Sequence, residues 1–483
     1  MELLKGFSGG DKVYFIGIKG TGTCALAEFL HNRGVYVSGS DRADVFYTDT
    51  ILKELGIPFY ESFSAEHIAR EKPDLVVYSD AYSFAKNPEM AEAQKLGIPV
   101  YQYSQAMGAY SKLHDSSGIS GVHGKTTLTA MTGTLMRGAG LPVQVLVGGA
   151  VRGFGNRSTI NQGNKYFVAE TDEYRRHFMY FNPRRIVLSS IEGDHQDFFP
   201  DYKSIRDAFL DYVRKLPSGG ELIYCSDNPG ASEVAEIVSG ERNDIQLSPY
   251  GFSADGDWGI VSLHSGPGYQ HMKLKGLGGV FELRVPGKHS CFNAAAALAL
   301  TSSLVKQEYG GWTPDRLENV RKALVEFKGS RRRSEVIGEA GGVLFIDDYG
   351  HHPTAIKTTI AGYKEFYGRR IVISFMSHTY SRTAALLEEF ASSLEDADIV
   401  MLHKIYASAR EDYRGGITGR TLYEKTRAIL GDSVHYCEEP EDGAGILEKL
   451  LRPGDLFVTM GAGDNWKLGQ KLFTMFSEKQ ENK

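Results

Sequence analysis

The sequence predicts a three-domain α/β protein, and three observations support that prediction. The chain has 483 residues, which is too long for one hydrophobic core and corresponds to about three domains. Short apolar segments with strand character alternate with segments whose apolar residues have helical spacing. Several apolar segments run directly into glycine turns or acidic residues, which is where open α/β sheets bind ligands.

The composition is that of an ordinary globular protein, with 42% apolar and 24% charged residues. A net charge of −6 argues against a nucleic-acid-binding surface. Four scattered cysteines without a Cys-x-x-Cys pair indicate reduced thiols in a cytoplasmic protein, not zinc ligands or disulfides. The first residues have no apolar signal core and no run has the length of a membrane span, so we expect no membrane insertion.

The chain begins with a predicted strand–turn–helix unit. Residues 13–16 form an apolar strand, a glycine turn follows, and a helix extends over about 23–32. The next strand, 35–40, ends in Asp41, which makes this the first half of a Rossmann-like unit with phosphate groups over the helix start. The glycines are spaced Gly-x-x-Gly-x-Gly, so a tight turn without a ligand stays open as an alternative. They are Gly17, Gly20 and Gly22.

Further predicted strands set the domain boundaries. We expect the first domain over 1–108, the second over 109–328 and the third over 329–483. Residues 240–280 are rich in glycine and alternate in polarity, which predicts a β-meander. The last ten residues are polar, and we expect them to be loose. The further strands are expected at 74–80, 98–102, 145–149, 166–169, 185–191, 222–225, 342–348, 371–375, 399–402 and 456–460.

The most informative stretch is the glycine-rich run 118–127, Gly-Ile-Ser-Gly-Val-His-Gly-Lys-Thr-Thr, which follows a polar run at 111–117. A glycine turn that ends in Gly-Lys-Thr at a helix start is a phosphate cradle. Lys125 would reach the terminal phosphates, and the Thr126 hydroxyl would meet Mg²⁺. The general pattern fails by one residue, because Ile119 stands where it requires glycine, so an ordinary loop remains an alternative.

Two of the predicted strands end in acids. The strand over 166–169 is followed by Glu170, Asp172 and Glu173, and the strand over 185–191 runs into an Asp-His pair at 194–195. In a phosphate-loop fold such strand ends lie beside the loop, where a carboxylate can meet Mg²⁺. A solvated acidic loop is the alternative, but the recurrence of the pattern weakens it.

The third domain carries a second unusual segment. An apolar strand ends in Asp347-Asp-Tyr-Gly-His-His352, and a proline then starts a helix. These are good metal ligands, but adjacent residues at a strand end point in different directions, which disfavours one compact metal site. Just before it, three adjacent arginines at 331–333 form either a solvated face or a phosphate clamp.

Taken together, these segments resemble the Mur ligases, the ATP-dependent amino-acid ligases that build peptidoglycan. The resemblance extends from Val13 to about Leu472, with the motifs in the expected order. It implies a Rossmann-like N-terminal domain for a UDP substrate, a central P-loop ATPase-like domain, and a C-terminal Rossmann-like domain that binds the amino acid and closes on ATP. The branch that uses UDP-muramic acid itself is the most similar. The segments that carry the resemblance are 17–22, 38–41, 120–127, 169–173, 191–197, 327–333 and 347–353.

The resemblance also assigns site residues. The implied catalytic residues are Lys125, Glu173, His195 and His351. The implied Mg²⁺ ligands are Thr126, Glu173 and His195. The implied ATP contacts are Gly121, His123, Gly124, Lys125, Thr126, Thr127, Asn293, Arg332, Arg333 and Asp348. The implied contacts to the other substrates are Gly17, Gly20, Thr21, Gly22, Asp41, Tyr349, His351, His352, His378 and Arg382.

Three positions depart from the family pattern. Ser190 and Ser290 each replace an asparagine, which puts one polar contact at each position in doubt. Thr379 replaces an arginine that helps to hold the carboxylate of the amino acid, so it bears most directly on substrate choice. The general base also stays open between His195 and a histidine of the third domain.

The implied activity is the ADP-forming ligation of L-alanine to the lactyl carboxylate of UDP-N-acetylmuramate through an acyl phosphate, in peptidoglycan precursor synthesis. We expect a cytoplasmic monomer or homodimer that binds small molecules and no nucleic acid. Three alternatives stay open: ligation of a whole tripeptide, nucleotide binding without catalysis, and a dinucleotide-dependent oxidoreductase. The last uses only residues 17–41 and leaves Lys125, Glu173 and His195 unexplained.

Overall fold

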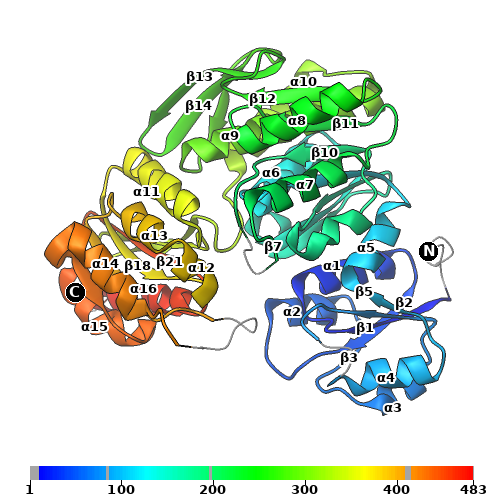
Figure 1. Ribbon diagram of the computed structural model, residues 1–483, viewed down its shortest axis with the longest axis horizontal. Helices are drawn as coiled ribbons and strands as arrows, with labels where there is room; N and C mark the ends of the chain where they lie inside the picture. The colour runs from blue at the N-terminus through cyan, green and yellow to red at the C-terminus, as the bar shows by residue number, and fades with distance from the viewer. Residues whose placement is uncertain (1–9, 83–85, 195–197, 408–414, 482–483) are drawn as a thin grey trace. The chain divides into compact units, whose positions relative to one another are not determined.

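The computed structural model of this chain describes residues 10–82, 86–194, 198–407 and 415–481 (Figure 1). The chain divides into two compact units. The first comprises Met1–Glu192, Lys203–Trp258 and Ala296–Val320. The second comprises Gly193–Tyr202, Gly259–Ala295 and Arg321–Lys483. Sheets covered by helices occur in both units, as the α/β prediction requires.

The first unit begins with a five-stranded sheet in the order β3-β2-β1-β4-β5, with all pairs parallel. The chain runs outward from β1 to β3 and then crosses back to β4, so strand order reverses beside β1. In open parallel sheets the ligand crevice lies at the carboxyl ends of the strands at this reversal. The glycine turn after β1 therefore has the position that the Rossmann-like prediction requires. The strands are β1 (Lys12–Ile16), β2 (Tyr36–Ser40), β3 (Phe59–Tyr60), β4 (Leu75–Tyr78) and β5 (Val100–Gln102), and the helices are α1 (Thr21–Asn32), α2 (Tyr47–Glu54), α3 (Ala65–Glu71), α4 (Pro88–Lys95) and α5 (Tyr103–Ser111).

Seven strands of a ten-stranded sheet lie in the first unit, in the order β12-β11-β10-β6-β9-β7-β8. All neighbouring pairs from β12 to β7 are parallel. The edge strand β8 is antiparallel to β7. The strands are β6 (Asp115–Ser120), β7 (Val143–Val151), β8 (Arg157–Asn161), β9 (Tyr166–Glu170), β10 (Arg185–Leu188), β11 (Glu221–Cys225) and β12 (Gln246–Gly251). The helices around it are α6 (Lys125–Gly138), α7 (Tyr202–Val213), α8 (Pro229–Glu241), α9 (Lys288–Tyr309) and α10 (Pro314–Glu326).

The end of the polar run before the phosphate loop belongs to the central strand β6, which was not among the predicted strands. Ser116 and Ser117 are buried in it, and the Ser116 hydroxyl donates to the backbone oxygen of Ser111 at 2.6 Å. A serine is small and can satisfy its hydroxyl on nearby backbone, so a buried strand can lack an apolar signal. Close packing also requires Gly118, because a Cβ there would lie 2.2 Å from the Tyr212 hydroxyl oxygen.

The β-meander expected over 240–280 is correct only in part. Strands β13 (Trp258–Gly266), β14 (Tyr269–Leu274) and β15 (Phe281–Leu283) form antiparallel pairs in sequence order. Strand β12 is instead parallel to β11 and belongs to the sheet of the first unit.

The second unit contains a six-stranded sheet in the order β16-β17-β21-β18-β19-β20. The edge strand β16 is antiparallel and all the other pairs are parallel. Its strands are β16 (Glu335–Ala340), β17 (Val343–Asp348), β18 (Arg370–Met376), β19 (Ile399–Leu402), β20 (Val434–Tyr436) and β21 (Asp455–Gly461). The helices are α11 (Pro353–Tyr367), α12 (Tyr380–Ala385), α13 (Leu387–Ser393), α14 (Gly419–Leu430), α15 (Ala444–Leu450) and α16 (Asn465–Glu481).

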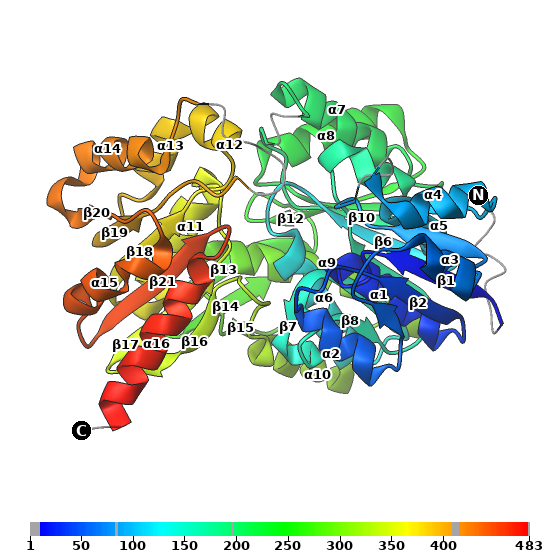
Figure 2. The same cartoon turned by 90° about the horizontal axis from the view of Figure 1, so that it is seen from below.

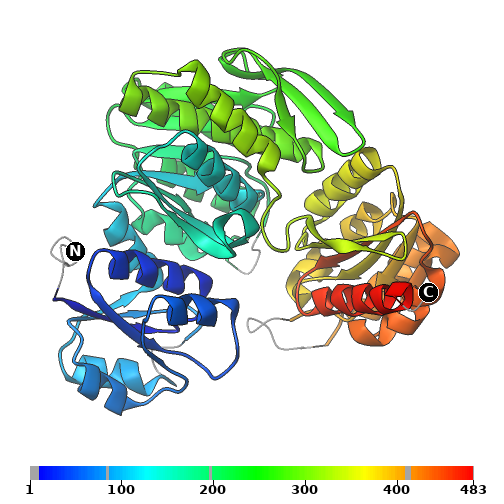
Figure 3. The same cartoon turned by 180° about the vertical axis from the view of Figure 1, so that it is seen from behind.

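Helix α16 overturns the expectation that the last ten residues are loose. It continues to Glu481 and lies along β16 and β21 (Figures 2 and 3). Phe473 and Phe476 each pack edge-on against Phe345 of β17, with ring centroids 5.7 Å apart. Two aromatic side chains at helical spacing therefore hold a segment that looks polar overall.

Two further expectations concern the whole chain. Within residues 10–82, 86–194, 198–407 and 415–481, no helix is both long and apolar enough to cross a bilayer. Cys24, Cys225 and Cys291 are buried free thiols and Cys437 is a half-buried one, as the scattered cysteine pattern predicts.

Candidate functional site

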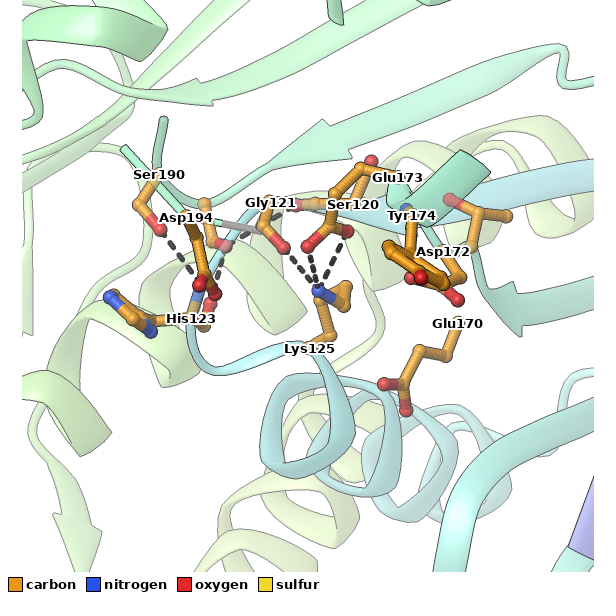
Figure 4. Close-up of polar contacts among 12 residues, drawn as sticks. Ser120, Gly121, His123, Lys125, Glu170, Asp172, Glu173, Tyr174, Ser190 and Asp194 are labelled. Carbon is orange, nitrogen blue, oxygen red and sulfur yellow. Dashed lines mark hydrogen bonds and ion pairs between the residues drawn. The ribbon is translucent and has the colours of Figure 1, made fainter. Parts of the chain in front are cut away.

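The predicted phosphate loop joins β6 to α6 in the first unit (Figure 4). Gly121 has a φ of +132°, and a Cβ there would lie 2.2 Å from the Ser189 hydroxyl oxygen, so only glycine fits. Gly124 caps α6 in the left-handed region, with a φ of +80°. These two glycines turn the chain so that the start of α6 follows directly on the carboxyl end of β6. The positive end of a helix favours an anion at such a place.

Lys125 is the first residue of α6, and its ammonium is held on two sides (Figure 4). It donates to the backbone oxygen of Gly121 at 2.6 Å and to the two carboxylate oxygens of Glu173 at 2.8 and 3.0 Å. The Glu173 side chain is 1% exposed and the Lys125 side chain is 14% exposed. Burial alone would lower the pKa of Lys125, but Glu173 and then Asp172 and Glu170 raise it above its usual value. Lys125 is therefore a fixed positive charge at the loop.

Glu170 is a site residue that the sequence reasoning did not assign. It is the last residue of β9, and its carboxylate accepts from the Thr126 hydroxyl at 3.1 Å and from the Gly148 backbone N–H at 2.9 Å. A Cβ at Gly148 would lie 2.4 Å from this carboxylate, so Gly148 makes room for it. The sequence signal for this role was the position of Glu170 at the end of an apolar strand, and the structure pairs that strand with β6.

The structure also accounts for the serine at position 190. The Ser190 hydroxyl accepts from the His123 backbone N–H at 3.0 Å, and its backbone oxygen accepts from Val122 at 2.9 Å. Ser189 adds a hydrogen bond to the His123 backbone oxygen at 2.7 Å. The His123 imidazole in turn contacts the Glu192 carboxylate. Ser190 thus supports the loop backbone directly.

The three predicted Mg²⁺ ligands have different outcomes. His195 lies outside the described residues. Thr126 faces Glu170, whereas Glu173 faces Lys125, so the structure does not bring Thr126 and Glu173 onto one common point. Hydroxyl and carboxylate oxygens are the donors that Mg²⁺ prefers, and Thr126 with Glu170 supplies both kinds.

The glycine turn of the N-terminal sheet is tightly packed. A Cβ at Gly17 would lie 2.7 Å from Ser79, and a Cβ at Gly22 would lie 2.6 Å from the Tyr103 hydroxyl. The Thr21 hydroxyl oxygen accepts from the Tyr47 hydroxyl at 3.1 Å.

Asp41 faces this turn rather than solvent. Its carboxylate accepts from the Lys19 backbone N–H at 2.8 Å and from the Tyr82 hydroxyl at 2.5 Å, and Asp41 is 3% exposed. In the structure Asp41 therefore supports the turn, and its predicted contact with substrate stays a prediction.

In the second unit, three predicted residues come together. The His351 and His378 ring centroids lie 5.5 Å apart, and His378 Nδ1 lies 3.0 Å from Arg382 Nη1. Arg382 is 5% exposed and pairs with Asp194 at 2.7 Å, a partner that the sequence did not indicate for it. Desolvation by the surrounding protein, then Arg382 and His378, lowers the pKa of His351 well below its usual value. His351 is therefore a neutral base beside a buried guanidinium.

Thr379, which replaces the family's arginine, caps the helix that carries Arg382. Its φ is +65°, which is strained for a β-branched residue. Its hydroxyl accepts from the Arg382 backbone N–H at 3.4 Å, and its own N–H donates to the Tyr406 backbone oxygen at 2.9 Å.

The arginines of the third domain gather around one ring. The guanidinium carbons of Arg332 and Arg333 lie 5.0 and 5.1 Å from the centroid of the Tyr349 ring. Arg332 also pairs with Asp347 at 3.1 Å. Asp348, predicted to face ATP, accepts from the Ser334 and Gly350 backbone N–H groups, each at 2.7 Å. In the structure Asp348 therefore organises its own turn.

Two further predicted residues, Asn293 and His352, are buried near helix starts. Asn293 lies in α9 and is 6% exposed, and the nearby Ser290 hydroxyl donates to the Pro286 backbone oxygen at 2.7 Å. His352 is 6% exposed at the N-cap position of α11. The ligand contacts expected of Asn293, Thr127 and Gly20 stay predictions.

Comparison with known proteins identifies the family. Three domain descriptions match this chain: the Mur ligase family catalytic domain at 12–114, the Mur ligase middle domain at 119–301, and the Mur ligase glutamate ligase domain at 332–463. The chain is also 51% identical over 474 residues to the UDP-N-acetylmuramate–L-alanine ligase of Treponema pallidum, which covers 97% of each chain. This chain belongs to the Mur ligase family.

Two solved Mur ligase structures share the fold. The UDP-N-acetylmuramate–alanine ligase of Thermotoga maritima matches with a TM-score of 0.76 and 24% identity, over 98% of this chain and 100% of that one. The murein peptide ligase of Psychrobacter arcticus matches with a TM-score of 0.66 and 22% identity, over 97% and 99%. Family membership confirms the predicted three-domain α/β fold class and the prediction of an ATP-dependent ligase.

Proposed function

We propose that this Mur ligase joins L-alanine to the lactyl carboxylate of UDP-N-acetylmuramate and forms ADP and phosphate. The observation that carries the proposal is the 51% identity, over almost the full length of both chains, to a relative of that name. This reaction contributes to the synthesis of the peptidoglycan precursor. A cytoplasmic location and a monomeric or homodimeric state stay predictions from the sequence.

The first half-reaction needs charge neutralisation and alignment more than covalent help. We assign the terminal phosphates of ATP to the start of α6, where Lys125 provides a fixed ammonium. Mg²⁺ would be held by Thr126 with Glu170, and it would neutralise further charge on the phosphates. Glu173 is bonded to Lys125, so its place among the Mg²⁺ ligands stays a prediction. Transfer of the γ-phosphoryl group to the lactyl carboxylate then gives an acyl phosphate.

In the second half-reaction the amino group of L-alanine attacks the acyl carbon and phosphate leaves. The attacking nitrogen must lose a proton, so a neutral base is required. His351 suits that role because its lowered pKa keeps the imidazole neutral near pH 7. Arg382 lies in the same cluster and offers a guanidinium to the carboxylate of the amino acid. His195 stays an alternative base outside the described residues.

The test is phosphate release from ATP with Mg²⁺ and UDP-N-acetylmuramate, with L-alanine, glycine, L-serine or the murein tripeptide added singly. We expect release that depends on L-alanine and a product heavier by one alanyl residue. Release only with the tripeptide would assign the chain to tripeptide ligation, with Thr379 as the first residue to examine. No phosphate release with any of the four acceptors would overturn the proposed ligation and favour nucleotide binding without catalysis.

A further inference from the structure

Lys19 is a buried lysine within the N-terminal glycine turn, and the proposed reaction does not yet use it. Its side chain is 0% exposed, although lysine is almost never fully buried unless it is paired. The turn containing Lys19 lies between β1 and α1, where the predicted diphosphate of the nucleotide-sugar substrate would lie.

The Lys19 ammonium contacts acceptors from two other segments of the chain, one containing Asp44 and Asp49 and the other containing Glu61. It lies 3.2 Å from an Asp49 carboxylate oxygen, 3.1 Å from Glu61 and 3.0 Å from the backbone oxygen of Asp44. Its Nζ also lies 5.2 Å from the centroid of the Phe59 ring. Burial alone would lower the pKa of Lys19, but Glu61 and Asp49 raise it above its usual value, so the group stays charged.

The backbone of Lys19 binds the same neighbouring segment. Its N–H donates to Asp41 at 2.8 Å, and its backbone oxygen accepts from the Thr48 hydroxyl at 2.6 Å. Lys19 therefore connects the turn to segment 41–49 through backbone and side chain together. Segment 41–49 also reaches the start of α1, because Tyr47 donates to the Thr21 hydroxyl oxygen.

The local charges explain why a cation is needed there. Two carboxylates, those of Asp49 and Glu61, lie within 3.2 Å of the Lys19 ammonium. A third, that of Asp41, accepts from the Lys19 backbone N–H. Without Lys19 they would place negative charge beneath a turn that receives a diphosphate. Like charges repel, and water screens the Asp49 carboxylate only weakly because its side chain is 8% exposed.

We propose that Lys19 is a positioning residue for UDP-N-acetylmuramate. Its ammonium fixes the Gly17–Gly22 turn against segment 41–49 and neutralises the carboxylates of Asp49 and Glu61. Lys19 does not touch the reacting atoms, because its ammonium is buried and bonded to Asp49, Glu61 and the Asp44 backbone oxygen. The inference rests on the proposed function, since it assigns Lys19 to the nucleotide-sugar substrate of that reaction.

The test separates binding of this substrate from the other steps. KM for UDP-N-acetylmuramate, KM for ATP, KM for L-alanine and kcat are measured for wild type and Lys19→Met, and UDP binding is measured by calorimetry. We expect Lys19→Met to raise KM for UDP-N-acetylmuramate about tenfold and to weaken UDP binding in parallel. KM for ATP and L-alanine should stay within about twofold of wild type. A merely structural lysine would lower the yield of folded protein and leave these KM ratios unchanged.

Two milder variants keep the test decisive if Lys19→Met does not fold. Glu61→Gln changes a side chain that is 55% exposed, and Asp49→Asn keeps the shape of a side chain that is 8% exposed. We expect each to raise KM for UDP-N-acetylmuramate about two- to fivefold. The matched control is Lys12→Met, an exposed lysine at the opposite end of β1, which should leave all four constants unchanged.

The outcomes distinguish the two proposals. A folded Lys19→Met protein with wild-type KM for UDP-N-acetylmuramate overturns the inference alone. If Lys19→Met does not fold, wild-type KM in both Glu61→Gln and Asp49→Asn overturns it. A wild-type protein that neither turns over UDP-N-acetylmuramate nor binds UDP overturns the proposed function and, with it, the inference.

Discussion

Two glycine turns in the first unit each carry a lysine, and the two lysines are placed in opposite ways. Lys19 lies inside its turn, is 0% exposed and bonds to Asp49 and Glu61 from segments below it. Lys125 lies after its turn as the first residue of α6, is 14% exposed and bonds to Glu173 and to its own loop. Buried inside its turn, Lys19 supports the backbone. Lys125 lies at the helix start, where its ammonium can exchange the Glu173 carboxylate for a phosphate of ATP.

The largest expected effect is the loss of kcat in Lys125→Ala, which we do not expect for a substitution of Lys19. Lys125→Ala should reduce kcat by about a thousandfold or more, because it removes the cation assigned to the transferred phosphate. It should also destabilise the first unit by about 3 kcal/mol, since breaking a buried pair is costly. The partner Glu173 is 1% exposed, so the variant would leave its carboxylate buried without the ammonium. Phosphate release and urea unfolding measure the two effects, and near-normal turnover would contradict the phosphate-loop assignment.

The histidine His403 shows what burial does to a basic side chain that is bonded to neutral groups, in contrast to the two lysines. His403 of the second unit bonds the Ser374 hydroxyl at 2.7 Å and the Cys437 backbone oxygen at 2.9 Å. Burial lowers its pKa to about 4, whereas the lysines keep their charge beside carboxylates. Between about pH 4 and 6.5 the unfolded chain binds a proton that the folded chain does not, so this histidine makes stability rise with pH.

The contribution of His403 should be complete above about pH 6.5 and fall by about 3 kcal/mol as the pH decreases to 4. Urea unfolding of wild type and His403→Gln at several pH values measures it as a difference. The variant should have the shallower pH dependence of stability. Parallel curves for the two proteins would show that His403 is not the group that titrates.

Glu170 tests whether a second carboxylate belongs to the phosphate loop. Glu170→Gln should lower kcat by about 10- to 100-fold and raise the Mg²⁺ concentration required, as expected when a metal ligand or its hydrogen-bond partner is changed. Gly148→Ala should have a similar effect, because its Cβ would lie 2.4 Å from the Glu170 carboxylate. Gly149→Ala is the matched control, since its Cβ would meet only Thr126 at 3.9 Å. Equal activity of the two alanine variants would count against a role for Glu170.

The smallest expected effect concerns the support of the phosphate loop. Ser190→Ala removes the hydroxyl that accepts from the His123 backbone N–H, which should cost about 1 kcal/mol. We expect KM for ATP to rise about fivefold and kcat to change little. Ser190→Asn restores an acceptor and should recover most of the loss. If Ser190→Asn behaves no better than Ser190→Ala, the hydrogen bond is not what position 190 provides.

The site was predictable from the sequence wherever its chemistry is local. The run from Gly121 to Thr126 has its turn and helix start encoded by neighbouring residues, so the structure confirms the loop where it was expected. Strand ends carrying acids were also visible, as in β9 and β17. The fold class followed from the same alternation of strands and helices.

The partners of these residues could not be predicted in the same way. The Glu170 contact to Thr126 joins residues 44 positions apart, and the Arg382 contact to Asp194 joins residues 188 positions apart. The Ser116–Ser117 segment of β6 lacked an apolar signal, and the Phe473 and Phe476 side chains of α16 were hidden in a polar composition. Strand β6 is defined by its pairing with β9 and β10, and α16 is held by Phe345 of β17, so both depend on distant segments.

The sequence by itself determined the fold class, the family resemblance and the backbone geometry of the two glycine turns, because these depend on local residue order. Only the tertiary structure decided how the two lysines differ. The burial of a charge depends on which distant segments surround it, and the sequence does not state that Asp49 and Glu61 lie beneath Lys19. Since burial and pairing set the charge and mobility of an ammonium, that arrangement separates a supporting lysine from one available to phosphate.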